Sequence, residues 1–192
     1  MSVSRKRVTA ILCLAFGVAS SWATGCSERA EIATGRSSVV GEASMTTFEA
    51  GERGSPVEFS AVAVDGREVT APSGSVATVI LFWGSWCAPC RAEATEVGDA
   101  ARRLADEGID VIGVAVRDTA AGVDGFVERF GVDYPVVLDD DGRIQVDLAE
   151  RTVLGGVPTT LVLDREGRIA CRIVGRLEAQ TLETAVAGVV DG

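Results

Sequence analysis

Two cysteines separated by two residues, Cys87 and Cys90, have a spacing that suits thiol–disulfide chemistry. They stand in the segment WGSWCAPC, where a long apolar run ends and a helical pattern begins. A helix N-terminus carries unpaired N–H groups and about half a positive charge, and both stabilise a thiolate. We therefore expect Cys87 to be the nucleophile that attacks a disulfide. Cys90 is expected to be the resolving and more buried thiol, which breaks the mixed disulfide.

The two residues between the cysteines refine this expectation. Pro89 suits the first turn of a helix, where its missing N–H is not needed. Ala88 adds no charge and no hydrogen-bond donor, which favours a reducing rather than an oxidising pair.

Other uses of paired cysteines fit the sequence less well. A structural clip or half of a zinc site is the main alternative, but there is no second CxxC and no histidine to complete four ligands. A haem attachment site needs histidine after the second cysteine, and here Arg91 follows it. The sequence therefore favours redox chemistry and predicts no metal and no organic cofactor.

Composition limits the other classes of function. The chain has 192 residues, of which 47% are hydrophobic and 24% charged, enough for one well-buried domain with appendages. Its net charge is −10, so we expect no nucleic-acid partner, because an acidic chain repels phosphate backbones. The absence of histidine removes the usual general base and every Ser-His-Asp or Cys-His site.

The elements around the cysteines can be predicted from hydrophobic periodicity. The run Val76–Trp83 is typical of a central strand buried on both faces, and Pro89–Glu107 has a helical period that ends at Gly108. The other expected elements, in chain order, are a hairpin over 57–70, a strand at 109–116, a helix around 123–130, a short strand at 134–138, a short helix at 143–150, a hairpin of strands 159–163 and 168–174, and a terminal helix around 182–189. This alternation predicts an α/β fold with a mixed sheet covered by helices on both faces.

The first residues have the order of an export signal. Three cations, Arg5, Lys6 and Arg7, precede an uncharged run, which predicts a signal peptide over residues 1–25. The run ends in Ala-Thr-Gly-Cys, which resembles a bacterial lipobox, so we expect Cys26 to be lipid-anchored. An ordinary cleaved signal, with Cys26 left as a free thiol, is the alternative, and a weak membrane span is a third reading. Residues 26–46 are small, polar and aperiodic, so we expect a flexible tether before a domain at 47–192.

Two segments together resemble a known family. ILFWGSWCAPCRAE and GVPTTLVLD, at residues 156–164, are similar to the TlpA/ResA-like branch of the thioredoxin superfamily, the membrane-tethered thiol–disulfide oxidoreductases found outside the cytoplasm. The resemblance covers roughly residues 56–190. It implies a thioredoxin-like fold with an N-terminal β-hairpin and an extra helix and strand before a cis-proline.

The resemblance also implies roles for single residues. Pro158 corresponds to the family's cis-proline, which lies against the active-site disulfide, and Val157 corresponds to the neighbouring residue whose backbone pairs with substrate peptide. Glu93 matches a carboxylate that lies beneath the thiols in ResA-like members and moves protons. A partly buried acid with a raised pKa could accept the proton of Cys90, whereas a solvated glutamate on the helix surface is the alternative.

The remaining aromatic and cysteine residues have competing interpretations. Trp86 is expected to form an apolar platform for a partner polypeptide, and Trp83 to pack in the core. Arg91 is expected to be a solvated charge, with stabilisation of the thiolate as the alternative. Cys171 is expected to be a buried free cysteine, with a bond to Cys26 or to another chain as the alternative.

These observations predict a lipid-anchored thiol–disulfide oxidoreductase on the extracytoplasmic face of the cell membrane. Its expected partners are cysteine-containing exported proteins, with apocytochrome c as one target implied by the resemblance, and a membrane thiol carrier that supplies electrons. An extracytoplasmic disulfide oxidase is one alternative. A thiol peroxidase is another, although the position three residues before Cys87, where it needs a hydroxyl, is Gly84. A non-enzymatic Cu(I) chaperone is the third.

Overall fold

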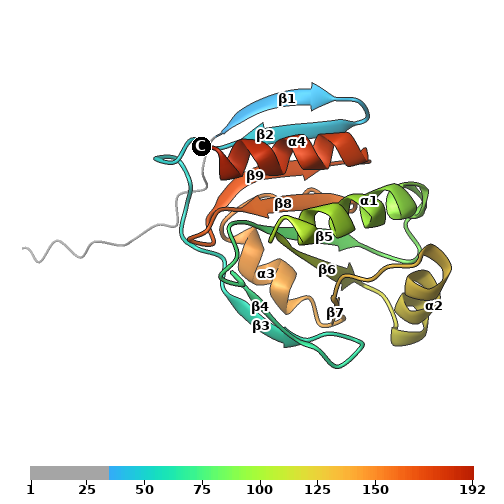
Figure 1. The fold of residues 1–192 in the computed structure, drawn as a ribbon. Coiled ribbons are helices and arrows are strands. Elements are labelled where there is room, and N and C mark those ends of the chain that lie inside the picture. The colour runs from blue at the N-terminus through green and yellow to red at the C-terminus, as the bar shows by residue number, and fades with distance from the viewer. Residues whose placement is uncertain (1–34) are drawn as a thin grey trace, which may run out of the picture.

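The computed structural model describes residues 35–192, and a seven-stranded mixed sheet lies at its centre (Figure 1). The signal peptide predicted over residues 1–25 and the lipid-anchored Cys26 predicted after it lie outside the described residues. From one edge to the other the strands are β1 (Arg36–Val40), β2 (Ala43–Thr47), β9 (Ile169–Val174), β8 (Thr159–Leu163), β5 (Thr78–Trp83), β6 (Asp110–Val116) and β7 (Val136–Asp139). β5, β6 and β7 are parallel to one another, and β8 runs antiparallel to β5.

Both faces of this sheet are covered, which explains why apolar runs form its centre. The helices are α1 (Ala88–Asp106), α2 (Ala120–Phe130), α3 (Arg143–Ala149) and α4 (Ala179–Val190). Side chains of α1, α2 and α4 pack on one face, while α3 and the separate hairpin of β3 (Phe59–Val62) and β4 (Glu68–Ala71) pack on the other (Figure 1). Every residue of β5 is therefore buried, as the run Thr78–Trp83 predicts.

The connection from β5 to α1 places the cysteine pair. Cys87 is the N-cap of α1, with extended backbone angles, and a proline stands in the first turn. The helix ends at Asp106 with Glu107 as its C-cap, and Gly108 takes a left-handed conformation with φ +80°. The helix predicted over 89–107 is confirmed to within one residue at each end.

The predicted fold is confirmed, including the hairpin over 57–70 and the additional helix and strand, α2 and β7, before the proline loop. Among residues 35–192, no helix is both long and apolar enough to cross a membrane.

The tether predicted over residues 26–46 is wrong for its second half. Residues 36–47 form the hairpin β1–β2, and β2 pairs with β9 at the edge of the sheet. Backbone pairing with an existing edge needs no apolar run, so a segment of small polar residues adds two strands here. Side chains support the pairing, since the Thr46 hydroxyl lies 2.9 Å from that of Ser37 and accepts a hydrogen bond from Arg172. The domain therefore begins before residue 47.

Candidate active site

Cys87 and Cys90 form a disulfide at the N-terminus of α1, with their Cα atoms 5.3 Å apart. The sulfur of Cys87 also accepts a hydrogen bond of 3.2 Å from the backbone N–H of Cys90. In the reduced protein the same N–H and the helix dipole would favour a thiolate on Cys87. The predicted juxtaposition of the two sulfurs is thus present in the structure.

The two cysteines are almost equally covered. Cys87 is 3% exposed and Cys90 is 2% exposed, so the expectation that Cys90 is clearly the more buried thiol is not confirmed in the disulfide form. The residues between them, Ala88 and Pro89, are exposed. The first turn of α1 is therefore exposed beside a largely covered disulfide.

Trp86 stands beside the disulfide and is 48% exposed. Its indole N–H points to the end of β6, where it donates to the carbonyls of Val116 and Arg117 at 3.3 and 3.1 Å. The guanidinium of Arg117 lies 5.1 Å from the centre of the Trp86 ring, a cation–π contact. Trp86 is thus a fixed aromatic surface, as expected for a platform, but Arg117 covers part of it.

Asp118, which follows β6, also holds the loop that carries Trp86. Asp118 accepts hydrogen bonds from the backbone N–H of Ser85 at 2.5 Å and from its hydroxyl at 2.9 Å. A Cβ on Gly84 would lie 2.6 Å from the Trp86 indole nitrogen, so any other residue here would displace the Trp86 ring. The hydroxyl side chain that a thiol peroxidase would need at this position is absent.

Sequence reasoning missed Arg117 and Asp118. The topology of the sheet could have located them. Both residues follow β6, which runs parallel to β5, and the carboxyl ends of parallel neighbouring strands lie at the same edge of the sheet. Arg117 has φ +49° and is, within residues 35–192, the sole non-glycine residue with positive φ. Strained backbone of this kind clusters at functional sites.

The proline loop lies on the other side of the disulfide. The peptide bond between Val157 and Pro158 is cis, as predicted. Thr159 holds the loop, since its hydroxyl donates to the carbonyls of Leu154 and Gly156 at 2.5 and 2.8 Å. Val157 is half-buried. The structure therefore brings this loop to the cysteine pair, and the pairing of its backbone with a partner stays a prediction.

Glu93 lies one turn of α1 beyond Cys90 and is 7% exposed. Its carboxylate Oε2 accepts a hydrogen bond of 2.6 Å from the backbone N–H of Leu177. Burial raises the pKa of Glu93 from its ordinary value of 4.5 to about 7, although the Leu177 N–H and the charge of Arg176 oppose the rise. The alternative of a solvated glutamate is therefore wrong, and near neutral pH this carboxyl can both accept and release a proton.

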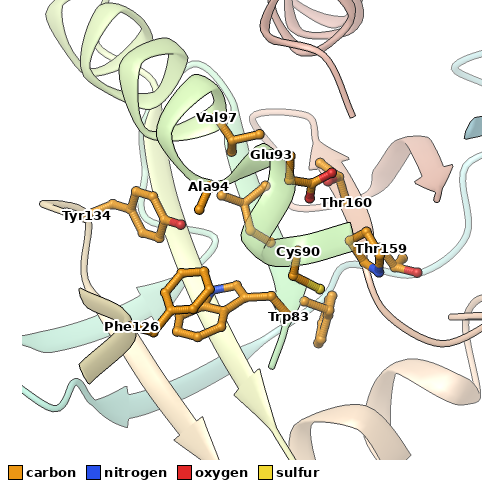
Figure 2. Close-up of a pocket in the computed structure, with 12 residues that line it drawn as sticks. Trp83, Cys90, Glu93, Ala94, Val97, Phe126, Tyr134, Thr159 and Thr160 are labelled. Atoms are coloured by element: carbon orange, nitrogen blue, oxygen red, sulfur yellow. The ribbon is translucent and has the colours of Figure 1, made fainter. Parts of the chain in front are cut away.

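A small cavity of about 20 Å³ lies beside Cys90 (Figure 2). Cys90 and Glu93 from α1 line it, together with Pro158, Tyr134 and Trp83. Trp83 also stacks on Phe126, with ring centroids 4.1 Å apart, which confirms that Trp83 packs in the core. Tyr134 is a further residue that sequence reasoning missed.

The other two residues singled out from the sequence take no part in the site. Cys171 on β9 is a free cysteine that is 1% exposed, and burial raises the pKa of its thiol to about 12. A buried thiol with so high a pKa is inert, as the core interpretation predicts. Arg91 is exposed, as expected for a solvated charge.

Comparison with known proteins agrees with this geometry. The sequence profile of the Redoxin family matches residues 44–188, which is most of the chain. The chain belongs to the Redoxin family. Within this family it is 30% identical over 96 residues to the thiol-disulfide oxidoreductase ResA of Bacillus subtilis, covering 50% of this chain and 51% of ResA. It is 34% identical over 118 residues to the thiol:disulfide interchange protein HelX of Rhodobacter capsulatus, covering 59% of this chain and 62% of HelX.

Solved structures show the same Redoxin-family fold. A DsbF homologue from Corynebacterium diphtheriae superposes with a TM-score of 0.68 at 28% identity, covering 75% of this chain and 92% of that one. The thioredoxin-like fold and the similarity to ResA are thereby confirmed. The matched segment spans between one half and two thirds of the length of ResA and HelX.

Proposed function

We propose that this Redoxin-family protein is a thiol–disulfide oxidoreductase that acts through Cys87 and Cys90. The observation that carries the proposal is the disulfide between Cys87 and Cys90 at the N-terminus of α1, with the cis-proline loop lining the cavity beside Cys90. The names of ResA and HelX, both thiol–disulfide enzymes, support it.

The first step in the reducing direction uses Cys87. Its thiolate attacks one sulfur of a partner disulfide and forms a mixed disulfide with it. The second partner sulfur leaves as a thiolate and takes a proton from solvent. The N-terminus of α1 favours this step because it stabilises the thiolate form of Cys87.

The second step uses Cys90 and Glu93. Cys90 gives its proton to Glu93 and attacks the sulfur of Cys87, so the intramolecular disulfide forms and the partner's first sulfur leaves as a thiolate. Two electrons have then passed to the partner, and a dithiol donor must reduce the pair again. Glu93 suits the role of base because it lies one helical turn from Cys90, lines the same cavity and has a pKa of about 7.

The partner is proposed to lie across Trp86 and the backbone of Val157 and Pro158. Trp86 offers an exposed aromatic face that its hydrogen bonds hold in place. The loop on the other side of the disulfide is fixed by the hydrogen bonds of Thr159. A cysteine in an extended segment of a partner polypeptide could thus reach Cys87 from between these two surfaces.

The physiological partners follow from the predicted export of the chain. We propose that residues 1–25 direct the protein out of the cytoplasm and that Cys26 carries a lipid anchor, which places the domain on the extracytoplasmic face of the membrane. Its substrates would then be cysteines of exported proteins, apocytochrome c among them. A membrane thiol carrier would supply the electrons. The reverse direction, oxidation of exported proteins, uses the same two steps in reverse order.

The proposal is tested by thiol exchange with a disulfide-containing peptide. Reduced wild-type protein should reduce the peptide, Cys87→Ser should be inactive, and Cys90→Ser should accumulate a mixed disulfide that mass spectrometry detects. Cys171→Ser is the matched control and should keep full activity, because this thiol is buried away from the site. Full activity of Cys87→Ser would overturn the mechanism. Equilibration of the wild-type pair with a glutathione buffer then decides whether it acts as a reductant or an oxidant.

A further inference from the structure

The indole N–H of Trp83 has no hydrogen-bond partner among residues 35–192, although the residue is only 4% exposed. Buried donors in native proteins are nearly always paired, and ordered water is the usual partner where protein groups provide none. Trp83 lines the cavity beside Cys90, so its N–H group is the first sign of a water site there.

The cavity has the size for such a site. Its volume is about 20 Å³, and one water molecule needs about 10–15 Å³. Gly113 on β6 lies against two of the side chains that line the cavity, Tyr134 and Trp83. A Cβ at this position would lie 2.9 Å from Cε2 of Tyr134 and 3.0 Å from Nε1 of Trp83, so any side chain would crowd both groups.

Two further polar groups meet at this cavity. Figure 2 shows Tyr134 and Glu93 among the residues that line this cavity. Oε2 of Glu93 accepts the hydrogen bond from the Leu177 N–H, and no described residue donates a hydrogen bond to Oε1. A water molecule could thus accept from Trp83 and Tyr134 and donate to Glu93, which gives it the two to four partners that buried water requires.

We propose that this cavity binds one water molecule between Trp83, Tyr134 and Glu93, and that Trp83 and Tyr134 are positioning residues that control proton uptake by Glu93. The inference rests on the proposed function, in which Glu93 takes the proton of Cys90. Neither aromatic residue touches the reacting sulfurs in this role. They act through the water and the carboxylate.

The direction of the effect follows from the charges around Glu93. Cys90 and Glu96 face it from α1, Arg176 from the segment before α4, and Tyr134 from the segment before β7. Burial raises the pKa of the Tyr134 hydroxyl well above its usual range, so this group stays protonated and can donate. A water that donates to the carboxylate stabilises its ionised form, and loss of the water should raise the pKa of Glu93.

The experiment is an NMR titration of the Glu93 carboxyl carbon in the reduced full-length protein. Tyr134→Phe removes one hydroxyl, and Trp83→Phe removes the N–H while an aromatic ring is kept. Each variant should raise the titration midpoint of Glu93 by roughly half to one pH unit. Phe130→Leu is the control, since it disturbs the packing of Phe126 against Trp83 but neither lines the cavity nor removes a polar atom, and it should leave the midpoint in place.

An unchanged midpoint in Tyr134→Phe would overturn the proposal, and so would an equal shift in Phe130→Leu. A crystal structure of the wild-type protein provides a second test that needs no variant. Water within hydrogen-bond distance of the Trp83 nitrogen supports the proposal, and an empty cavity overturns it. Because the titration involves no turnover, failure of this inference is distinguishable from failure of the thiol-exchange assay.

Discussion

The carboxylate of Glu93 on α1 accepts a hydrogen bond of 2.6 Å from the backbone N–H of Leu177, in the segment between β9 and α4. This contact joins two parts of the chain 84 residues apart and fixes the acid at the cavity beside Cys90. It also opposes the effect of burial, since a donated hydrogen bond favours the charged carboxylate. The acid is thus held where it is neither fully ionised nor fully neutral at physiological pH.

Glu93→Gln should change how stability depends on pH. The wild-type pKa is raised from 4.5 to about 7 by burial, so the native state binds more protons than the unfolded state between these pH values. The stability that this proton contributes is present below about pH 4.5 and lost as pH rises to about 7, a fall of roughly 3 kcal/mol. Glutamine keeps an acceptor for Leu177 but does not titrate, so the variant should lack this fall.

Urea unfolding of the oxidised wild-type and Glu93→Gln proteins across this pH range measures the difference in their free energies of unfolding. The variant should gain stability relative to wild type as the pH rises. Parallel curves for the two proteins would show that Glu93 titrates as an ordinary exposed acid.

Arg117 offers a matched pair of substitutions. Alanine and glycine both remove the cation–π contact with Trp86, but only alanine retains a side chain at φ +49°. The left-handed conformation is unfavourable for every residue except glycine, so Arg117→Gly should be more stable than Arg117→Ala by about 1 kcal/mol. Denaturant unfolding provides the comparison. Equal stability of the two variants would mean that the loop carries no backbone strain.

Much of the fold could be predicted because apolar periodicity is strong where both faces of the sheet are covered. Val76–Trp83 and the helix that follows it are the clearest case, and the WGSWCAPC junction predicts the position of the disulfide. The resemblance to ResA-like proteins added Glu93 and Pro158, which composition and spacing alone do not single out.

The hairpin β1–β2 could not be predicted from the same signals. Its strands contain mainly serine, threonine and valine without a regular apolar face, and their order depends on pairing with β9, more than a hundred residues away in the sequence. Tyr134 and Asp118 were missed for a similar reason. Tyr134 follows the end of α2, and Asp118 follows the end of β6. Both come close to the cysteine loop only after the parallel strands have assembled.

Hydrogen exchange distinguishes this hairpin from a tether. β2 is paired on both sides, with β1 and with β9, so amides in the range 44–47 that are bonded to these neighbours should exchange far more slowly than those of an unstructured segment. The measurement is mass spectrometry of peptides that cover residues 36–47. Exchange of this segment as fast as that of the unfolded chain would contradict its place in the sheet.

In the proposed mechanism the N-terminus of α1 keeps Cys87 ionised at neutral pH while Cys90 stays within bonding reach. The pH dependence of alkylation of Cys87 in the reduced protein, followed by mass spectrometry with Cys171 as an internal reference, tests this most directly. The midpoint for Cys87 should lie well below the value of about 8.5 for a free thiol, because the helix end and the Cys90 N–H stabilise its thiolate. A midpoint at or above that of a free thiol would contradict the account.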